Sequence, residues 1–483
     1  MSVASAIALC LGSGYLLVGS AWPSSESRSD LLLRLSLSVG FGVGIFSVVF
    51  FLARVFDIDR FIAIDMLIVA LLAAMFFLRR SRARIVRAPK PVSEDFELPR
   101  WLHRLLMASF AISVCAALYS TALRIIDHPH GDGWDAFAIW DLHARFLFRG
   151  GSHWRDGFSA LIPWSHPDYP LLLPAAIAHF WTYLGNDNPM VPTLIGVAFA
   201  FGTLGLLYSS LSRLRGHNAA MLGGLALSST PFFVEQGTAQ YADVPVSFFF
   251  LAAIALFSLY HQKGSGSQNQ RAYLVLSGVA FGFAAWTKNE GILFALAAVT
   301  AQLLVLCCRE HPDLSNASKP QGQLKQWLPL ATLAVAMSPG LALVFWFKHS
   351  VAPPSDLFSS PATMFHRIFV PVRYWAVLEW YAKEFFRFGH WRLIPGTVLL
   401  GILYFTLRDE RTGRQEPAFR ASFWTLAFTL AGYSAIYLIT PYDIYWHLRF
   451  SLSRLFLQVW PSAIFLFFAS IPARAVEKSQ NEA

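Results

Sequence analysis

One short stretch of the sequence, residues 131–145, combines acidic and aromatic side chains in a way that suits proton transfer. It contains the three carboxylates Asp132, Asp135 and Asp141 and the two indoles Trp134 and Trp140. A carboxylate that aromatic rings partly shield from water becomes more basic, and it can then take a proton from a hydroxyl group. Asp135 follows Trp134 directly and has no evident partner on a helix, so it is the preferred candidate for such a base.

The other two acids of this stretch keep the choice of base open. Asp141 stands four residues before Arg145, and this spacing favours an ion pair on the surface of a helix. The three acids could also cap and solvate a helix that lies at the edge of a membrane. We therefore retain Asp132 and Asp141 as alternatives to Asp135.

Two further polar sites stand beside apolar segments. His166 and Asp168 precede a proline-rich apolar stretch, where they could bind a divalent cation, orient a phosphate or bind a sugar. They could equally be a cap and a turn residue. Asp243 begins a long apolar run and could face the interior of a helix bundle. It could instead satisfy the free backbone N–H groups at the start of a helix.

The composition places these residues in a membrane protein. Of the 483 residues, 55% are hydrophobic and only 14% are charged, which is too apolar a balance for a soluble chain of this length. The net charge of +9 comes from short basic clusters between apolar runs rather than from one continuous stripe. This pattern indicates membrane topology and argues against nucleic acid as a partner.

The apolar runs predict an all-α bundle of about thirteen membrane spans. A hydrocarbon core of about 30 Å requires roughly 20 apolar residues in a helix. Such runs start near Val3, Leu31, Phe61, Leu102, Pro189, Asn218, Val244, Ala272, Gly291, Trp327, Leu393, Ser422 and Leu455. The first run is expected to be a retained helix. The pair Gly278 and Gly282 predicts that two of these helices approach closely.

The basic clusters orient the spans. The densest cluster, in residues 79–90, is expected to be cytoplasmic, which puts residues 127–169 outside. The stretch 170–184 is too short to span, and we expect a helix that lies in the outer interface. The predicted N-terminus is then outside and the C-terminus inside. The outer face is built from residues 127–184, 240–243, 287–290, 348–392 and 442–454.

Basic side chains on the outer face run against the positive-inside bias, so they invite a functional explanation. We single out Lys288, His447, Arg449 and Arg454. Together with Tyr and Trp at membrane depth, they could form a pocket for an anionic headgroup that carries a long lipid tail. The alternatives are contacts with ordinary phospholipid headgroups, or a local ion pair such as that of Lys288 with Glu290.

The order of these features resembles the GT-C superfamily of membrane glycosyltransferases, in particular the relatives of protein O-mannosyltransferases and lipid A aminoarabinose transferases. Asp135, the Ala144-Arg145 pair and residues 151–154 are similar to the series in the first outer loop of those enzymes. Residues 165–170, then 241–245, and then the Gly-rich run 278–288 ending in Thr-Lys follow in the same order. The similarity spans roughly residues 127–298. The family's adjacent acid pair is replaced here by Trp134-Asp135.

The resemblance implies sugar transfer from a polyprenyl-phosphate donor to a glycan, lipid or protein acceptor on the outer face, with inversion at the anomeric carbon. Asp135 would act as the base, and Lys288, Arg449 or Arg454 would stabilise the departing phosphate. Asp168 and Asp243 would hold the sugar, or a divalent cation if one is used. The expected units are an N-terminal addition, 1–100, a catalytic core, 101–308, and C-terminal membrane helices, 309–483.

Two rival functions remain at this point. A lipid or solute transporter would place charges at the bilayer midplane within broken helices and would often show inverted repeats. A polysaccharide polymerase or ligase would use basic and His residues on the same outer face instead of an acidic base. The expected location is the inner membrane of a bacterium, with the active face toward the periplasm.

Overall fold

The computed structural model describes most of the chain as helix. The described residues are 3–22, 28–82, 98–262, 267–308, 320–358, 361–392, 395–407 and 417–470. These residues form helices joined by turns and contain no strand. A helix satisfies all its backbone hydrogen bonds internally, which is why apolar runs in lipid adopt this structure. The predicted all-α polytopic bundle is confirmed.

The described elements follow one another along the chain. They are α1 (Val3–Ala21), α2 (Arg28–Val55), α3 (Phe61–Arg82), α4 (Arg100–Asp127), η1 (Ala136–Trp140), α5 (Asp141–Arg149), η2 (Gly151–Phe158), η3 (Pro163–Ser165), α6 (Leu172–Leu184), α7 (Met190–Arg215), α8 (His217–Ser228), α9 (Pro231–Gln236), α10 (Asp243–His261), α11 (Ser267–Thr287), α12 (Asn289–Cys307), α13 (Pro320–Ser350), η4 (Asp356–Phe358), α14 (Pro361–Ile368), α15 (Pro371–Arg387), α16 (Gly396–Leu407), α17 (Pro417–Ile439) and α18 (Ile444–Ser470).

Ten of the described helices are long and apolar enough to cross a membrane. The other three expected spans start near Asn218 in α8, near Ala272 in α11 and near Leu393, just before α16. Of these, α11 has 21 residues, whereas α8 has 12 and is followed, after a break at Thr230-Pro231, by the short α9. Residues 393–394, before α16, lie outside the described part, as do most of the expected cytoplasmic stretch 79–90 and residues 264–266 of the expected linker 264–268.

The last span begins earlier than expected. Helix α18 starts at Ile444 rather than near Leu455, so nearly all of the expected outer segment 442–454 is helical. Ile444, Leu448 and Leu452 recur every four residues and are buried against the bundle. Arg454, the last residue of that expected segment, lies within the helix, and carboxylates of neighbouring segments balance its charge.

The short helix expected at residues 170–184 is present as α6. Of its 13 residues, 11 are buried by other parts of the bundle. It packs against α2 and α5, and its His179 ring lies among aromatic rings of α2. The N-terminal helices cover α6, and the sequence could not show this packing because it depends on segments far apart in the chain.

The centre of the bundle is α10, in which 16 of 19 residues are buried. A helix that is apolar on all sides belongs in such a position. Helices α11 and α13 cross closely beside it. A Cβ atom added at Gly340 would lie 2.5 Å from the Cα atom of Gly282, and one added at Gly278 would lie 2.5 Å from the Cβ atom of Ala336. The predicted close approach at Gly278 and Gly282 is therefore present.

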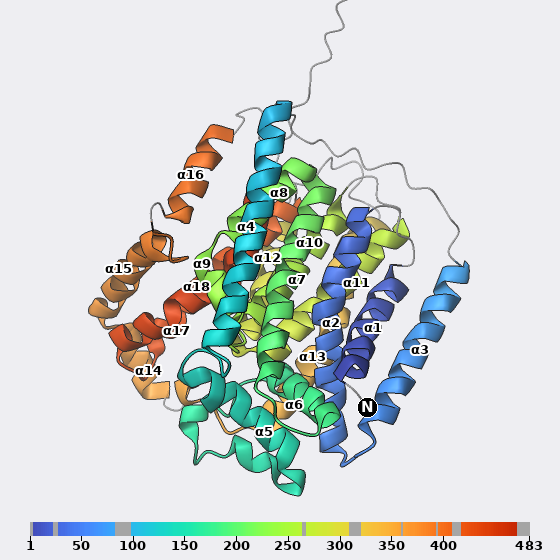
Figure 1. Ribbon diagram of the computed structural model, residues 1–483. Coiled ribbons are helices and arrows are strands. Elements are labelled where there is room, and N and C mark those ends of the chain that lie inside the picture. The colour runs from blue at the N-terminus through green and yellow to red at the C-terminus, as the bar shows by residue number, and fades with distance from the viewer. Residues whose placement is uncertain are drawn as a thin grey trace, which may run out of the picture.

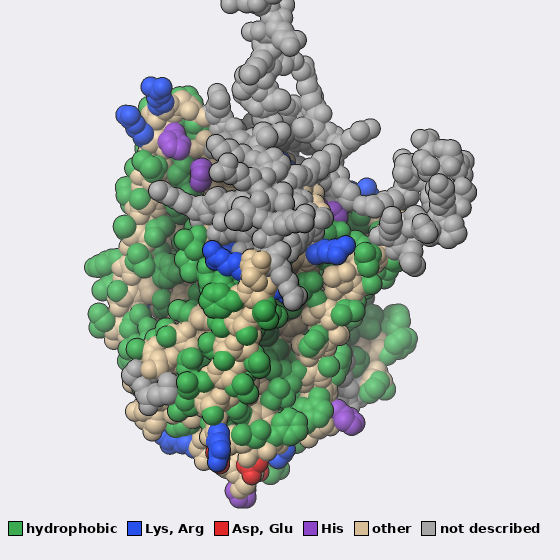
Figure 2. All heavy atoms as spheres, turned by 90° about the vertical axis from the view of Figure 1, so that its right-hand side faces the viewer, with side chains coloured by type: hydrophobic (Ala, Val, Ile, Leu, Met, Phe, Trp, Pro, Cys, Tyr) green, Lys and Arg blue, Asp and Glu red, His purple; other side chains and the backbone are tan. Residues whose placement is uncertain are grey.

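The polar segments that precede α6 gather at one end of the bundle. Figure 1 shows α5 and its neighbouring turns at the lower end, where the N-terminus also lies. In Figure 2, apolar side chains cover the middle of one face, while charged and His side chains lie toward its lower and upper ends. This belt is the surface that lipid tails would cover. The site described next lies at the ends of α10, α12 and α18 that meet the segment 128–170.

Candidate active site

A tight turn and a single π-helical turn present the first acid of the site. Gly131 and Gly133 adopt positive φ angles of 77° and 73°, a region that favours glycine. A Cβ atom at Gly131 would also lie 2.8 Å from the side chain of Gln240. Asp135 follows this turn and directly precedes η1, the π-helix Ala136–Trp140. Such π-helical turns occur frequently at functional sites.

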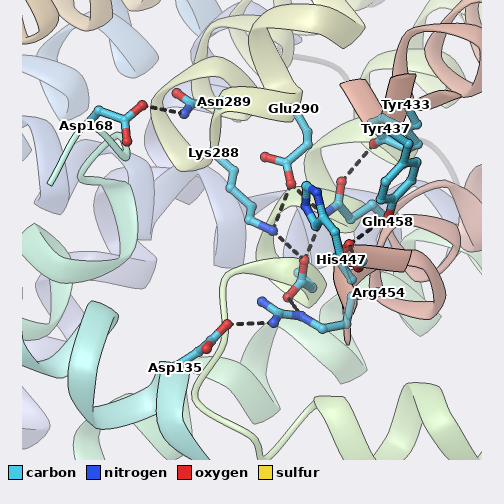
Figure 3. A network of polar contacts seen from close by, with 12 residues as sticks. Asp135, Asp168, Lys288, Asn289, Glu290, Tyr433, Tyr437, His447, Arg454 and Gln458 are labelled. Atoms are coloured by element: carbon cyan, nitrogen blue, oxygen red, sulfur yellow. Dashed lines mark hydrogen bonds and ion pairs between the residues drawn. The ribbon is translucent and has the colours of Figure 1, made fainter. Parts of the chain in front are cut away.

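Arg454 joins Asp135 to the start of the central helix. Its Nη1 atom donates to Oδ2 of Asp135 at 2.6 Å, and its Nε atom donates to Oδ2 of Asp243 at 2.9 Å. Figure 3 shows Arg454 reaching from α18 toward Asp135. Asp243 is fully buried, whereas the side chain of Asp135 is 27% exposed. The fork of the guanidinium thus links a buried acid to an accessible one.

A second cation and two further polar groups complete the network. Lys288 Nζ lies 2.8 Å from Asp243 Oδ1 and 2.9 Å from Glu290 Oε1. Gln458 donates to Asp243 Oδ1 at 2.7 Å and to Glu290 Oε1 at 3.3 Å. Its amide oxygen accepts a hydrogen bond from Tyr433 at 2.8 Å. Both oxygens of Asp243 are therefore engaged, and burial of this acid is compensated by two cations.

Two tyrosine rings lie beside the cations. The guanidinium of Arg454 lies 4.6 Å from the ring centroid of Tyr241, and Lys288 Nζ lies 6.0 Å from that of Tyr169. Burial raises the pKa of Tyr241 to about 12 and that of Tyr169 well above its usual value. Both phenols therefore stay protonated at neutral pH and offer the cations neutral π faces.

The segment that contains His166 and Asp168 forms another side of the site. Asn289 donates to Asp168 Oδ2 at 3.0 Å, and Lys348 donates to the backbone oxygen of Asp168 at 2.8 Å. His166, in the left-handed region at φ 48°, stacks on Tyr169 with ring centroids 4.8 Å apart. Because Asn289 stands between Lys288 and Glu290, this segment is adjacent to the network.

Asp132 lies close to the network in sequence but has a different partner. Arg124 of α4 forms a hydrogen bond and ion pair with its carboxylate, and His128 Nδ1 lies 3.5 Å from Oδ1. The backbone N–H of Asp132 donates to the backbone oxygen of Ala239 at 3.3 Å. These contacts make Asp132 an anchor between α4 and the turn before α10.

Asp141 is buried, and the ion pair expected between it and Arg145 is long. Arg145 Nη2 is 4.0 Å from Asp141 Oδ2, while Arg145 Nε lies closer to Asp187, at 3.2 Å. Burial raises the pKa of Asp141 to about 7, against the opposing effect of Arg145. Such a pKa suits a base. Only 3% of Asp141 is exposed, however, whereas 27% of the Asp135 side chain is.

The remaining two predicted basic residues occupy different surroundings. His447 Nδ1 lies 2.9 Å from Thr440 Oγ1, and its ring packs against Tyr437 and Tyr442. Arg449 is exposed, with its guanidinium 5.6 Å from the ring of Phe450. Arg449 and Arg454 are five positions apart on α18, so the two side chains leave the helix on different faces. The structure brings Arg454, and not Arg449, to Asp135.

The two acids suggested as metal ligands are both held by protein donors. Asp243 accepts hydrogen bonds from Lys288, Arg454 and Gln458, and Asp168 accepts one from Asn289. These N–H donors occupy oxygens that a divalent cation would need. In the described ranges, no group of three or more His, Cys, Asp or Glu side chains is placed to hold a metal.

Several residues of the network were not among the predicted site residues. Gln458 lies one helical turn after Arg454, and its signal was an amide within an apolar run. Lys348 ends a long apolar helix, where a lysine is ordinary. Glu290 was considered only as a local partner of Lys288, and the structure shows that it also accepts from Gln458. Only the fold reveals that these side chains converge.

Comparison with protein families gives one match. Residues 165–320 match the family described as dolichyl-phosphate-mannose-protein mannosyltransferase. The matched segment contains Asp168, Asp243 and Lys288, whereas Asp135 and Arg454 lie outside it. Neither a curated protein nor a solved structure gives a significant match. The match confirms the resemblance predicted from the sequence: this chain is similar to the GT-C superfamily of membrane glycosyltransferases.

Proposed function

We propose that this protein transfers a sugar from a polyprenyl-phosphate donor to an acceptor hydroxyl, with Asp135 as the base. One observation carries the proposal. Arg454 connects the accessible Asp135 to the buried Asp243, which also holds Lys288. A carboxylate that can take a proton thus stands beside two cations that can bind a phosphate. The family match supports a lipid-phosphate-linked sugar as donor.

The chemistry needs one base and no paired acid. The acceptor hydroxyl gives its proton to Asp135 as its oxygen attacks the anomeric carbon. The bond from that carbon to the phosphate oxygen breaks, and the electron pair leaves with the polyprenyl phosphate. Arg454 and Lys288 stabilise the charge that develops on this leaving group. A single displacement from the face opposite the phosphate inverts the anomeric carbon.

Asp243 has a supporting role in this mechanism. Its oxygens are engaged by Lys288, Arg454 and Gln458, so it is not free to hold a sugar. It fixes the two cations next to each other. Asp168 is held by Asn289 and Lys348, and with His166 on the ring of Tyr169 it lines the side from which a sugar can approach. We propose these two residues as sugar contacts.

We place the site on the periplasmic face of a bacterial inner membrane. The basic stretch 79–90 supports a cytoplasmic position for the opposite end of the bundle. Insertion of a peptide tag into linker residues 264–268 tests this orientation in cells. The tag should be labelled only after the membrane is permeabilised, and labelling of intact cells would contradict the orientation.

Transfer itself is tested in two steps. Mass spectrometry of lipids from a deletion strain should show a polyprenyl-phosphate sugar that accumulates and disappears on complementation. The purified protein, given that lipid and extracts of the envelope, should release polyprenyl phosphate and glycosylate an acceptor. If no lipid-linked sugar accumulates and the protein consumes none, the proposed function is wrong.

A further inference from the structure

Both cations at the centre of the site are already paired. Arg454 contacts Asp135 and Asp243, and Lys288 contacts Asp243 and Glu290. Three carboxylates surround two cations, so the cluster carries one net negative charge when all five are ionised. A donor phosphate is also negative. The phosphate therefore gains most from a cation when one of the carboxylates gives way.

Burial decides which carboxylate can move. Asp243 is fully buried and its oxygens accept from three side chains, so its displacement would leave several groups unpaired. Asp135 lies at the accessible end of the network, with 27% of its side chain exposed. It meets Arg454 through one oxygen, at 2.6 Å. Asp135 can return to water at much smaller cost than Asp243.

The backbone around Asp135 also suits a movement. Gly131 and Gly133 adopt left-handed conformations just before it, and the π-helical turn of η1 follows. The rest of the segment is anchored elsewhere, since Asp132 is held by Arg124 and Trp140 is buried against Tyr169.

We propose that the donor phosphate displaces Asp135 from Arg454, so that both oxygens of the base become free only in the donor-bound state. Without the donor, Oδ2 of Asp135 is engaged by the guanidinium, which holds the carboxylate in place. Arg454 binds the phosphate, and Asp135 turns toward the acceptor. This exchange makes the donor the first substrate and the acceptor the second. The inference rests on the proposed function.

Binding of undecaprenyl phosphate to the purified full-length protein tests this exchange without any measurement of transfer. In D135N, the amide competes for Arg454 more weakly than the carboxylate does. The lipid should therefore bind about three- to tenfold more tightly than to the wild type, the gain expected when one ion pair of ordinary strength is removed. If Asp135 were only a base, the affinity would not rise.

The matched control is D132N. This substitution removes the same charge from the same loop, but Asp132 pairs with Arg124 rather than with Arg454. The affinity of D132N for undecaprenyl phosphate should equal that of the wild type. Equal tightening in both variants would show a general effect of charge and would overturn the proposal. Unchanged or weaker binding by D135N would overturn it as well.

A second measurement uses the wild-type protein and does not depend on the folding of a variant. Carbodiimide labelling of carboxylates, read by mass spectrometry, should modify Asp135 more strongly after undecaprenyl phosphate is added. Labelling of Asp135 that stays constant or falls contradicts the exchange. The proposed function and this inference are refuted by different results. A wild type that binds no polyprenyl phosphate refutes the proposed function, whereas binding without release of Asp135 refutes only this inference.

Discussion

Arg454 contacts Asp135 across 319 residues of sequence, with 2.6 Å between Nη1 and Oδ2. The contact joins the loop before η1 to the first part of α18, two segments that lie outside the portion of the chain matched by the mannosyltransferase family. It also explains how an arginine can lie within a helix long enough to span the membrane. Its charge is balanced by Asp135 and by the buried Asp243.

Arg449 and Arg454 make a matched pair for substitution, because both were predicted to bind the donor and only one contacts the network. Replacement of Arg454 by Lys keeps the charge but cannot bridge two carboxylates. Transfer by R454K should fall about 100-fold or more, the usual cost of losing a group that stabilises transition-state charge. R449K should stay within about twofold of the wild type. Initial rates at saturating donor measure both variants, and equal losses would contradict the assigned contacts.

Asp243→Asn should destabilise the folded protein markedly. The substitution leaves Lys288 and Arg454 buried without their common counter-ion, which typically costs about 3–5 kcal/mol. The midpoint of thermal unfolding in detergent should therefore fall markedly. D168N provides the comparison, because Lys348 also bonds the backbone oxygen of that residue and keeps a partner. A D243N protein as stable as D168N would show that Asp243 does not hold the cations.

Asp141 predicts how stability changes with pH. Its pKa in the folded protein, about 7, is higher than in the unfolded chain. The folded state therefore holds this proton more tightly, and stability falls as the pH rises from about 4 to 7. D141N removes the effect, so the variant should gain stability over the wild type at pH 8, by up to roughly 2–4 kcal/mol, and clearly less at pH 5. Unfolding midpoints at both pH values measure this, and a gain that is equal at both would be contrary to expectation.

The crossing of α11 and α13 predicts that a side chain at Gly340 destabilises the protein. Gly401, in α16, provides the control. A Cβ atom at Gly340 would lie 2.5 Å from the Cα atom of Gly282, a backbone contact that cannot be relieved by a side-chain rotation. G340A should therefore lower the free energy of unfolding by about 1–3 kcal/mol, and the thermal midpoint should fall with it. At Gly401 a Cβ atom meets no other atom within 4 Å. G401A should be neutral or slightly stabilising, and a G340A protein as stable as G401A would show that the helices are not so close.

The sequence was informative about most membrane helices because an apolar run of sufficient length has few alternatives in lipid. It was less informative where a polar residue interrupts a run. The break before Pro231 divides an expected span into α8 and α9. Arg454 was expected to lie outside a span and lies within α18, because its neutralising partners come from elsewhere in the chain. Such partners cannot be recognised without the fold.

The same limitation applies to the candidate site. The unusual polar residues Asp135, Asp243, Lys288 and Arg454 could be picked from the sequence because charged groups beside apolar runs are costly. Their roles could not be distinguished. Asp243 was expected to hold a sugar or a metal, yet its oxygens are occupied by protein donors. Arg449 and Arg454 were equivalent candidates until the helix set them on different faces.

The activity of D135N relative to D132N tests the central claim most directly. Both variants remove one negative charge from the same loop, and thermal unfolding of each purified protein establishes that it is folded. With donor and acceptor supplied, D135N should lose transfer by about 100-fold or more, the contribution expected of a general base. D132N should retain most of the wild-type rate. Near-normal transfer by folded D135N would contradict the account.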